Sequence, residues 1–470
     1  MSEVTKPILL DETGQSINTT LGGLAKDTTA QGISAANQTI GSNINTKGNQ
    51  IAEGLRDIAN AISGKKTGTI YGFHINGSES DPEAAVTYLA DAVGMNPAGM
   101  SFSSGGSFSY GSWERAFFMP RPCMLKYDGT VDYYLKESDY TKKEDGTASD
   151  VTNTSYAGNA MMEWGRNDKK IWMKIVPTSG DAKSGDVFIA DYQADPDFHD
   201  WPFHNCDGVS VPHFYTPIYN GSLIDGKLRT LSGQALIFGK TAQEELDAAH
   251  ANNPGQDILW ETEVFADIEL INALHYLMFK TLDVPAKLGL GFTSSNEAGM
   301  KAWRTGELNT KGLFFGYNDG THAVKSFGME NWWGMQWRRY LGHIVVNGSQ
   351  KCKLTRGTED GSSAEGYNLT GDGYITKGVT PGGTSGGYIS EVTFTEHGIF
   401  PKTASGSSST YFCDGLWFNN AITSVPLRGG GAASGVGCGV ACVFLNVAAS
   451  DASWGVGASL SCKPLAAYAR

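Results

Sequence analysis

One short stretch, GGTSGG (residues 382–387), places Ser385 in a formal G-x-S-x-G. In hydrolases that spacing presents a nucleophilic serine on a sharp turn between a strand and a helix. Here the next residues are YISEVTF, whose alternating pattern predicts a strand instead of a helix. We therefore predict a Gly-rich structural segment at Ser385 and no catalytic residue.

A second stretch, DYQADPDFHDWPFHNCDG (191–208), gathers side chains that could hold a metal: Asp195, Asp197, His199, Asp200, His204 and Asp207. An EF-hand calcium loop requires glycine at its sixth position and glutamate at its twelfth, and counting from Asp191 or Asp195 supplies neither. A solvated, turn-rich loop is expected. HExxH, P-loop and G-x-G-x-x-G motifs are absent from the sequence, and His275 is expected to be a hydrogen-bonded core residue. We predict no metal, no cofactor and no enzymatic activity.

The composition excludes several classes of partner. A formal net charge of −13 argues against binding nucleic-acid phosphates or anionic lipid, which require a basic face. No apolar run approaches the length of a membrane span, and no secretory signal is recognised. We expect no nucleic-acid partner, no membrane insertion and synthesis in a cytoplasm. The seven cysteines are expected to be reduced, with a Cys413–Cys462 disulfide as an alternative.

The elements that carry these residues differ along the chain. The first 66 residues contain no aromatic residue and no cysteine. In residues 33–65, Ile or Leu recurs at positions 1 and 8 of three eleven-residue repeats, a period that gives a helix one nearly straight apolar stripe. Ile at core positions favours bundles of three or four helices over two. We predict an oligomeric, trimeric stalk or attachment arm over 1–66; a flexible polar leader is the alternative.

The remaining chain predicts an α+β fold with much irregular backbone. Ser80 and Glu83 form a capping-box pattern, which predicts a helix over 78–94. Residues 257–282 predict the strongest helix, and short strands with Asp-Gly turns surround Gly129 and Gly146. We expect a β-rich intermediate domain over 67–185 and a further domain over 186–470.

The stretch FGMENWWGMQWRRY (327–340) concentrates three tryptophans and two arginines. Trp332, Trp333 and Trp337 can bury large areas, and Arg338 and Arg339 can stack on their rings. Taken alone, the pattern favours a core cluster over a ligand site.

This stretch is also similar to the G-N-x-W-x-W segment of the formylglycine-generating-enzyme-like branch of the C-type lectin fold. Arg428, Gly429 and Gly430 match the R-G-G of that branch. Between about residue 68 and the C-terminus, SDPEAAVTYLADAVGM, FFMPRPCMLKYDGTVDYYL, YNGSLIDGKLRTLSG, NTKGLFFGYNDG and SGSSSTYFCD resemble, in order, phage and prophage tail proteins of gut bacteria. The resemblance implies a C-type lectin-like fold over 186–470, with short strands, about two helices and long Gly-rich loops.

It further implies a tail receptor-binding protein whose variable region, about 415–456, is the target of a diversity-generating retroelement. In such proteins adenines are rewritten, mostly in AAY codons, which cannot become Lys, Glu, Gln or Met codons. None of these four residue types occurs between Gly415 and Val456.

A replaceable face must be separate from the residues that hold the fold. The expected framework consists of Tyr411, Cys413, Asp414, Cys438, Gly439, Val443, Leu445, Ala458, Leu460 and Cys462. The expected exposed, receptor-binding set consists of Leu416, Trp417, Asn419, Ala421, Thr423, Val425, Gly431, Ala432, Ala433, Gly435, Val436, Val440, Ala441, Asn446, Val447, Ser450, Asp451, Ser453, Trp454 and Val456.

The function implied is that of a homotrimeric adhesin in the virion, at a tail tip or tail fibre. It would bind a bacterial cell-surface receptor, protein or glycan, and contact other tail proteins through its N-terminus. A structural tail-tip protein with a fixed surface is one alternative, and an enzyme on the same scaffold is another. The catalytic cysteines of formylglycine-generating enzymes are not recognisable, and the calcium-binding Glu-Pro-Asn or Gln-Pro-Asp triplet of sugar-binding C-type lectins is absent.

Overall fold

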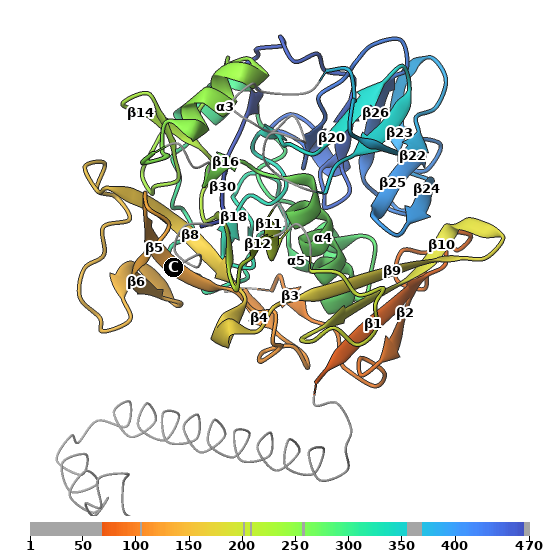
Figure 1. The fold of residues 1–470 in the computed structure, drawn as a ribbon, viewed down its shortest axis with the longest axis horizontal. Helices are drawn as coiled ribbons and strands as arrows, with labels where there is room; N and C mark the ends of the chain where they lie inside the picture. Colours follow the sequence, from red (N-terminus) through yellow and green to blue (C-terminus); the bar gives the residue numbers. More distant parts are fainter. Residues whose placement is uncertain are drawn as a thin grey trace, which may run out of the picture. The chain divides into compact units, whose positions relative to one another are not determined.

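Short strands make up most of the regular structure, and helices are few (Figure 1). The computed structural model describes residues 68–103, 106–200, 203–206, 209–255, 259–354 and 369–464. The β-rich character expected from the sequence is confirmed. The stalk predicted for residues 1–66 lies outside the described residues.

Two sheets take most of their strands from the first half of the described residues. Their strand orders are β2-β1-β10-β9 and β16-β30-β13-β8-β5-β6-β7. Their strands are β1 (Ile70–Ile75), β2 (Val86–Ala90), β5 (Arg121–Lys126), β6 (Val131–Lys136), β7 (Asp139–Lys143), β8 (Gly158–Trp164), β9 (Trp172–Thr178), β10 (Asp181–Ala190), β13 (Phe214–Pro217), β16 (Trp260–Thr262) and β30 (Leu460–Cys462). The domain boundary expected between residues 185 and 186 is wrong, because it falls inside β10. The chain from Thr69 onward forms one compact unit.

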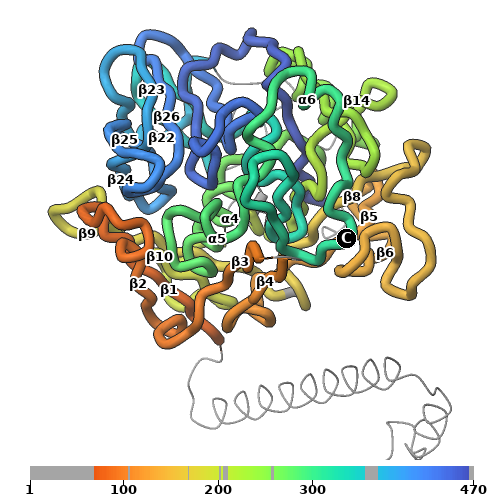
Figure 2. Tube along the Cα trace, turned by 180° about the vertical axis from the view of Figure 1, so that it is seen from behind, coloured from red at the N-terminus to blue at the C-terminus, as the bar shows by residue number. Residues whose placement is uncertain are grey.

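A third sheet, with the order β23-β26-β28-β27-β19-β29, is built from the C-terminal third. Its strands are β19 (Trp337–Arg339), β23 (Thr384–Tyr388), β26 (Gly415–Asn419), β27 (Leu427–Arg428), β28 (Val443–Leu445) and β29 (Val456–Gly457). Figure 2 shows β23 and β26 beside β22, next to the β24–β25 hairpin.

The smaller sheets are a three-stranded one and several hairpins. Their strands are β20 (His343–Val346), β21 (Ser349–Cys352), β22 (Ile375–Val379), β24 (Glu391–Thr395), β25 (Gly398–Thr403), β3 (Gly99–Ser101), β4 (Ser107–Ser109), β11 (Asn205–Cys206), β12 (Val209–Ser210), β14 (Ser222–Ile224), β15 (Lys227–Arg229), β17 (Lys325–Ser326) and β18 (Met329–Glu330).

The longest described helix, α4 (Phe265–Phe279), lies in the interior and confirms the strongest helix prediction from residue 265 onward. The start of the predicted span is wrong, because Trp260–Thr262 form strand β16. Thirteen of its fifteen residues are buried, so it is a core helix and not one with a single apolar side. The other described helices are α3 (Ala242–His250), α5 (Val284–Leu288) and α6 (Glu297–Ala302), with the short 3-10 helices η1 (Arg166–Asp168) and η2 (Gly435–Gly437). Among the described helices, none is long and apolar enough to cross a membrane.

The helix predicted over 78–94 is wrong. The Asp81 carboxylate accepts hydrogen bonds from the backbone N–H groups of Glu83 and Ala84, at 2.9 and 3.2 Å, and forms a turn. Strand β2 follows, and it buries Val86 and Tyr88 on alternate positions. The β-branched and aromatic run therefore pairs with β1 instead of continuing a helix.

Candidate functional site

The six-stranded C-terminal sheet has two chemically different faces. Paired residues of neighbouring strands share a face, which places Trp417, Phe444 and Trp337 together on the outer side. Leu416 and Phe418 are buried on the inner side. We call the three outer residues, Trp337, Trp417 and Phe444, the aromatic face. All three are partly exposed.

Trp417 is held flat by glycines of its own strand and the next one. A Cβ atom at Gly386 would lie 2.3 Å from Trp417 Cδ1, and a Cβ at Gly415 would lie 2.4 Å from Cζ3. The two contacts are at opposite ends of the indole. The ring therefore lies flat over the backbone of β23 and β26 at these two glycines, which have no side chains. This is the structural role of the GGTSGG stretch: Ser385 lies in strand β23, and no nucleophile turn is formed.

The rings of the aromatic face contact one another. Trp337 and Trp417 have centroids 5.4 Å apart and planes at 89°, and Phe444 lies 5.7 Å from Trp417 at 37°. Trp337 therefore stands perpendicular to the flat Trp417 ring. Among the described residues neither of these two indole N–H groups has a hydrogen-bond partner, and neither is buried. The buried Trp332 and Trp333, by contrast, donate to Asn272 Oδ1 and the Gly289 carbonyl, at 3.0 and 3.1 Å.

The inner side of the sheet is fixed by a buried charge network. Arg428 donates to Glu263 Oε1 at 2.8 Å and to the Trp332 carbonyl at 2.9 Å, and its guanidinium lies 3.5 Å from the Trp332 ring centroid. Arg338 approaches Glu263 Oε2 at 3.4 Å. Burial, with nearby Arg428 as a second cause, lowers the pKa of Arg338 to about 9. The N-W-W and R-G-G stretches thus contact each other through Trp332 and Arg428.

Asp414 holds the loop that precedes β28. Its carboxylate accepts the Ala441 N–H at 2.7 Å, and burial raises its pKa well above the ordinary value. A Cβ at Gly439 would lie 1.8 Å from Asp414 Oδ1, so only glycine fits beside this carboxylate. The expected framework residues are buried, except for the partly exposed Tyr411.

The structure divides the twenty residues expected on the receptor-binding face. Thirteen are partly or fully exposed: Trp417, Asn419, Ala421, Thr423, Ala433, Gly435, Val436, Ala441, Asn446, Ser450, Asp451, Ser453 and Trp454. The other seven are buried, and their expected exposure is wrong: Leu416, Val425, Gly431, Ala432, Val440, Val447 and Val456. Leu416 and Val440 belong to the main core, whereas Val447 and Val456 pack with Leu427 in a separate small cluster.

Sequence reasoning missed two members of the aromatic face. Trp337 was grouped with its buried neighbours Trp332 and Trp333, and Phe444 was left out of the expected set. The signal for Phe444 was present: in VFL its neighbours Val443 and Leu445 were expected framework, and strand alternation places the residue between them on the opposite face.

In the described part of the stretch 191–208, aspartates form ion pairs with lysines, while Asp207 lies outside the described residues. Asp195 and Asp197 lie 3.0 and 3.1 Å from Lys174 Nζ, and Asp200 lies 2.5 Å from Lys170 Nζ. Among the described residues no group of three His, Cys, Asp or Glu side chains could hold a metal ion. The absence of a metal and of a cofactor stays a prediction.

His275 is a hydrogen-bonded core histidine, as expected. Its ring nitrogens lie 2.7 Å from the Ile271 carbonyl oxygen and 2.6 Å from Ser326 Oγ. The six cysteines whose side chains are described, 123, 352, 413, 438, 442 and 462, are buried and form no disulfide with one another, which fits the expected reduced thiols.

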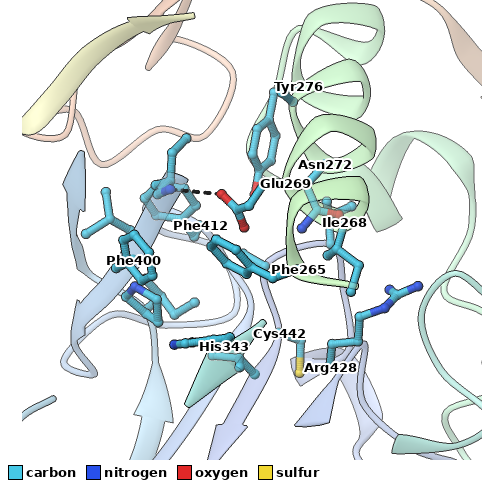
Figure 3. Close-up of a pocket in the computed structure, with 18 of the residues that line it drawn as sticks. Phe265, Ile268, Glu269, Asn272, Tyr276, His343, Phe400, Phe412, Arg428 and Cys442 are labelled. Atoms are coloured by element: carbon cyan, nitrogen blue, oxygen red, sulfur yellow. Dashed lines mark hydrogen bonds between the residues drawn. The ribbon is translucent and has the colours of Figure 1, made fainter. Parts of the chain in front are cut away.

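A cavity of about 60 Å³ lies on the inner side, between α4, the β24–β25 hairpin and the sheet (Figure 3). Glu269 faces it and accepts the Ile399 N–H at 2.9 Å. Burial raises the pKa of Glu269 to about 7 and lowers that of His343 to about 3, while the Cys442 thiol has a pKa well above its ordinary value for the same reason. At neutral pH this imidazole and this thiol are uncharged, and the space admits only a few water molecules.

The fold and this site define a β-rich protein that displays partly exposed aromatic rings on a glycine-backed sheet. No protein-family model matches the chain, and no curated protein matches it. Among solved structures, the "Major Tropism Determinant U1 Variant" aligns with 74% of this chain and 72% of that chain, at 11% sequence identity and a TM-score of 0.27. A likeness at that score does not establish a common fold.

Proposed function

We propose that this chain is a phage tail adhesin that binds a receptor on the bacterial host surface through its C-terminal sheet. The observation that supports it is the aromatic face: three large rings lie partly exposed on a sheet whose inner side is buried. Aromatic side chains held in this way are the residues that dominate binding energy at interfaces. The same sheet carries Trp417 and Asn419 of the expected variable set on its outer side.

The separation between surface and framework also supports the proposal. The exposed positions lie on strands and loops whose inner side is held by Arg428, Glu263 and Asp414. A binding surface supported by a buried network can change its outer residues without loss of the fold. In the resemblance described above, the variable region of tail adhesins requires this property.

The test is binding of the labelled full-length protein to intact cells of a panel of gut bacterial strains, measured by flow cytometry. We expect binding to at least one strain, and Trp417→Ala should weaken it by about tenfold or more, the effect of losing one central aromatic contact. Trp172→Ala removes a partly exposed tryptophan from β9, in a different sheet, and is the matched control. Equal loss in both variants, or no loss in Trp417→Ala, would contradict the proposed site.

We also propose that the adhesin is a homotrimer that joins other tail proteins through residues 1–66. Three linked sites can raise the effective affinity by roughly 10²–10⁴ over one site. Light scattering on the full-length protein should give three times the chain mass of 50.2 kDa. A monomer mass would contradict the trimer.

A further inference from the structure

We infer that the aromatic face binds uncharged sugar rings of a bacterial surface glycan. This inference rests on the proposed function and names the chemical class of the receptor. The aromatic face offers two surfaces at right angles, the flat ring of Trp417 and the standing ring of Trp337. A pyranose ring has a C–H face that can pack on the exposed part of the Trp417 ring. Its rim of hydroxyl groups can meet the neighbouring Trp337, whose ring centroid lies 5.4 Å from that of Trp417.

The free indole N–H groups distinguish a sugar from a purely apolar ligand. The N–H groups of Trp337 and Trp417 have no partner among the described residues. Covering them with hydrocarbon would leave two donors without acceptors, which costs free energy. A hydroxyl-rich ligand supplies acceptors for both donors while its C–H face covers the rings.

The rim of the aromatic face is polar and uncharged. Asn419 follows Trp417 on the same face, Thr384 pairs with Asn419, and alternation places Asn446 beyond Phe444. All three are at least partly exposed. Amide and hydroxyl groups can donate to and accept from sugar hydroxyls.

The charges nearby argue for a neutral glycan over an anionic one. Between Gly415 and Val456 the charged residues are Arg428, which is buried against Glu263, and Asp451, which is exposed. The net charge of −13 also repels polyanions. No exposed cation of this region could therefore pair with a phosphate or carboxylate.

The direct test uses saturation-transfer NMR of the full-length protein with methyl glycosides of glucose, galactose, mannose and N-acetylglucosamine, and with glucuronic and sialic acids as charged probes. We expect a signal for at least one neutral probe and a weaker one for the acids. Trp417→Ala should reduce it by about tenfold, Trp417→Phe should restore part of it, and Trp172→Ala should leave it unchanged. No signal for any neutral probe, or preference for the acids, would overturn the inference.

Treated cells separate this inference from the proposed function. Mild periodate oxidises sugar diols and should abolish cell binding, whereas proteinase K should leave it intact. If proteinase K abolishes binding and periodate does not, the receptor is a protein: the sugar is overturned and the adhesin stands. If the wild type binds no cells but a neutral sugar gives a signal that depends on Trp417, the sugar site stands and the adhesin is overturned.

Discussion

At the scale of single residues, glycines determine where the aromatic rings of the site lie. Gly386, on the strand next to that of Trp417, leaves room for the indole, because a Cβ atom added at this glycine would lie 2.3 Å from the ring. Its backbone is in a region that alanine can adopt, so the cost of a substitution is steric. A single added methyl group at residue 386 would therefore displace the Trp417 ring.

Gly386→Ala is therefore expected to weaken cell binding about as much as Trp417→Ala. The added methyl group either lowers the free energy of unfolding by about 1–3 kcal/mol or is accommodated by a shift of the Trp417 ring. Gly382→Ala is the matched control, because its Cβ would meet nothing closer than Asn420 Nδ2 at 4.0 Å. Flow cytometry measures binding, and thermal unfolding measures the stability of both variants. Normal binding by Gly386→Ala would show that the placement of Trp417 does not matter.

Glu263 is the residue on which the inner network depends. It faces both Arg428 and Arg338, and all three are buried. Glu263→Gln leaves two guanidinium groups without a counter-charge, and we expect the free energy of unfolding to fall by about 3–5 kcal/mol. Glu244→Gln, which removes the exposed pair with Lys240, should lower it far less, because solvent screens that pair. Urea denaturation measures the free energy of unfolding of both variants. Equal losses would show that burial does not make the Glu263 ion pairs more important than the exposed pair.

At the scale of elements, α4 and the β24–β25 hairpin meet at Glu269, and this contact should depend on pH. Burial raises the pKa of Glu269 in the folded protein to about 7, above its ordinary value of 4.5. The folded state therefore binds more protons than the unfolded state between these values, and stability from this group falls as pH rises from about 4.5 to about 7.

Glu269→Gln should flatten that part of the stability profile. The difference between variant and wild type is at most roughly 3 kcal/mol across the window, since one pKa unit corresponds to 1.36 kcal/mol, and water in the adjacent cavity makes it smaller. Urea denaturation at pH 4.5 and pH 7.5 measures it. Wild type and variant with parallel profiles would show that Glu269 titrates normally.

Sequence patterns predicted those helices and strands that are determined by their own apolar periodicity and turn residues. Helix α4 follows from a long apolar run, and the strands around Gly129 follow from alternation and turn residues. The segment 86–90 was misassigned because a capping pattern at Ser80 and Glu83 outweighed its strand alternation. The aromatic face required knowledge of pairing: only the register of β23 with β26 places Gly386 opposite Trp417.

At the scale of the whole molecule, burial predicts which positions could vary. Twelve of the thirteen exposed positions of the expected set can accept new side chains, whereas Gly435 has a φ of +57° that favours glycine. The seven buried positions support the core. Val425 and Leu416 have no exposed surface, and loss of a buried aliphatic side chain costs about 2–5 kcal/mol for Leu and Ile. A diversified face should therefore be narrower than the stretch 415–456 that encodes it.

Deep sequencing of the 3′ end of this gene, in a population that carries it, measures this directly. We expect substitutions at the exposed positions, Asn419 and Asn446 among them, while Leu416, Val425 and Asp414 stay constant. Trp337 lies outside the stretch and should also stay constant, so that one wall of the aromatic face persists while its neighbours change. Equal variation at Val425 and Asn419 would show that burial does not constrain the region. A uniform stretch would indicate a fixed surface, in which the aromatic face still binds but is not replaced.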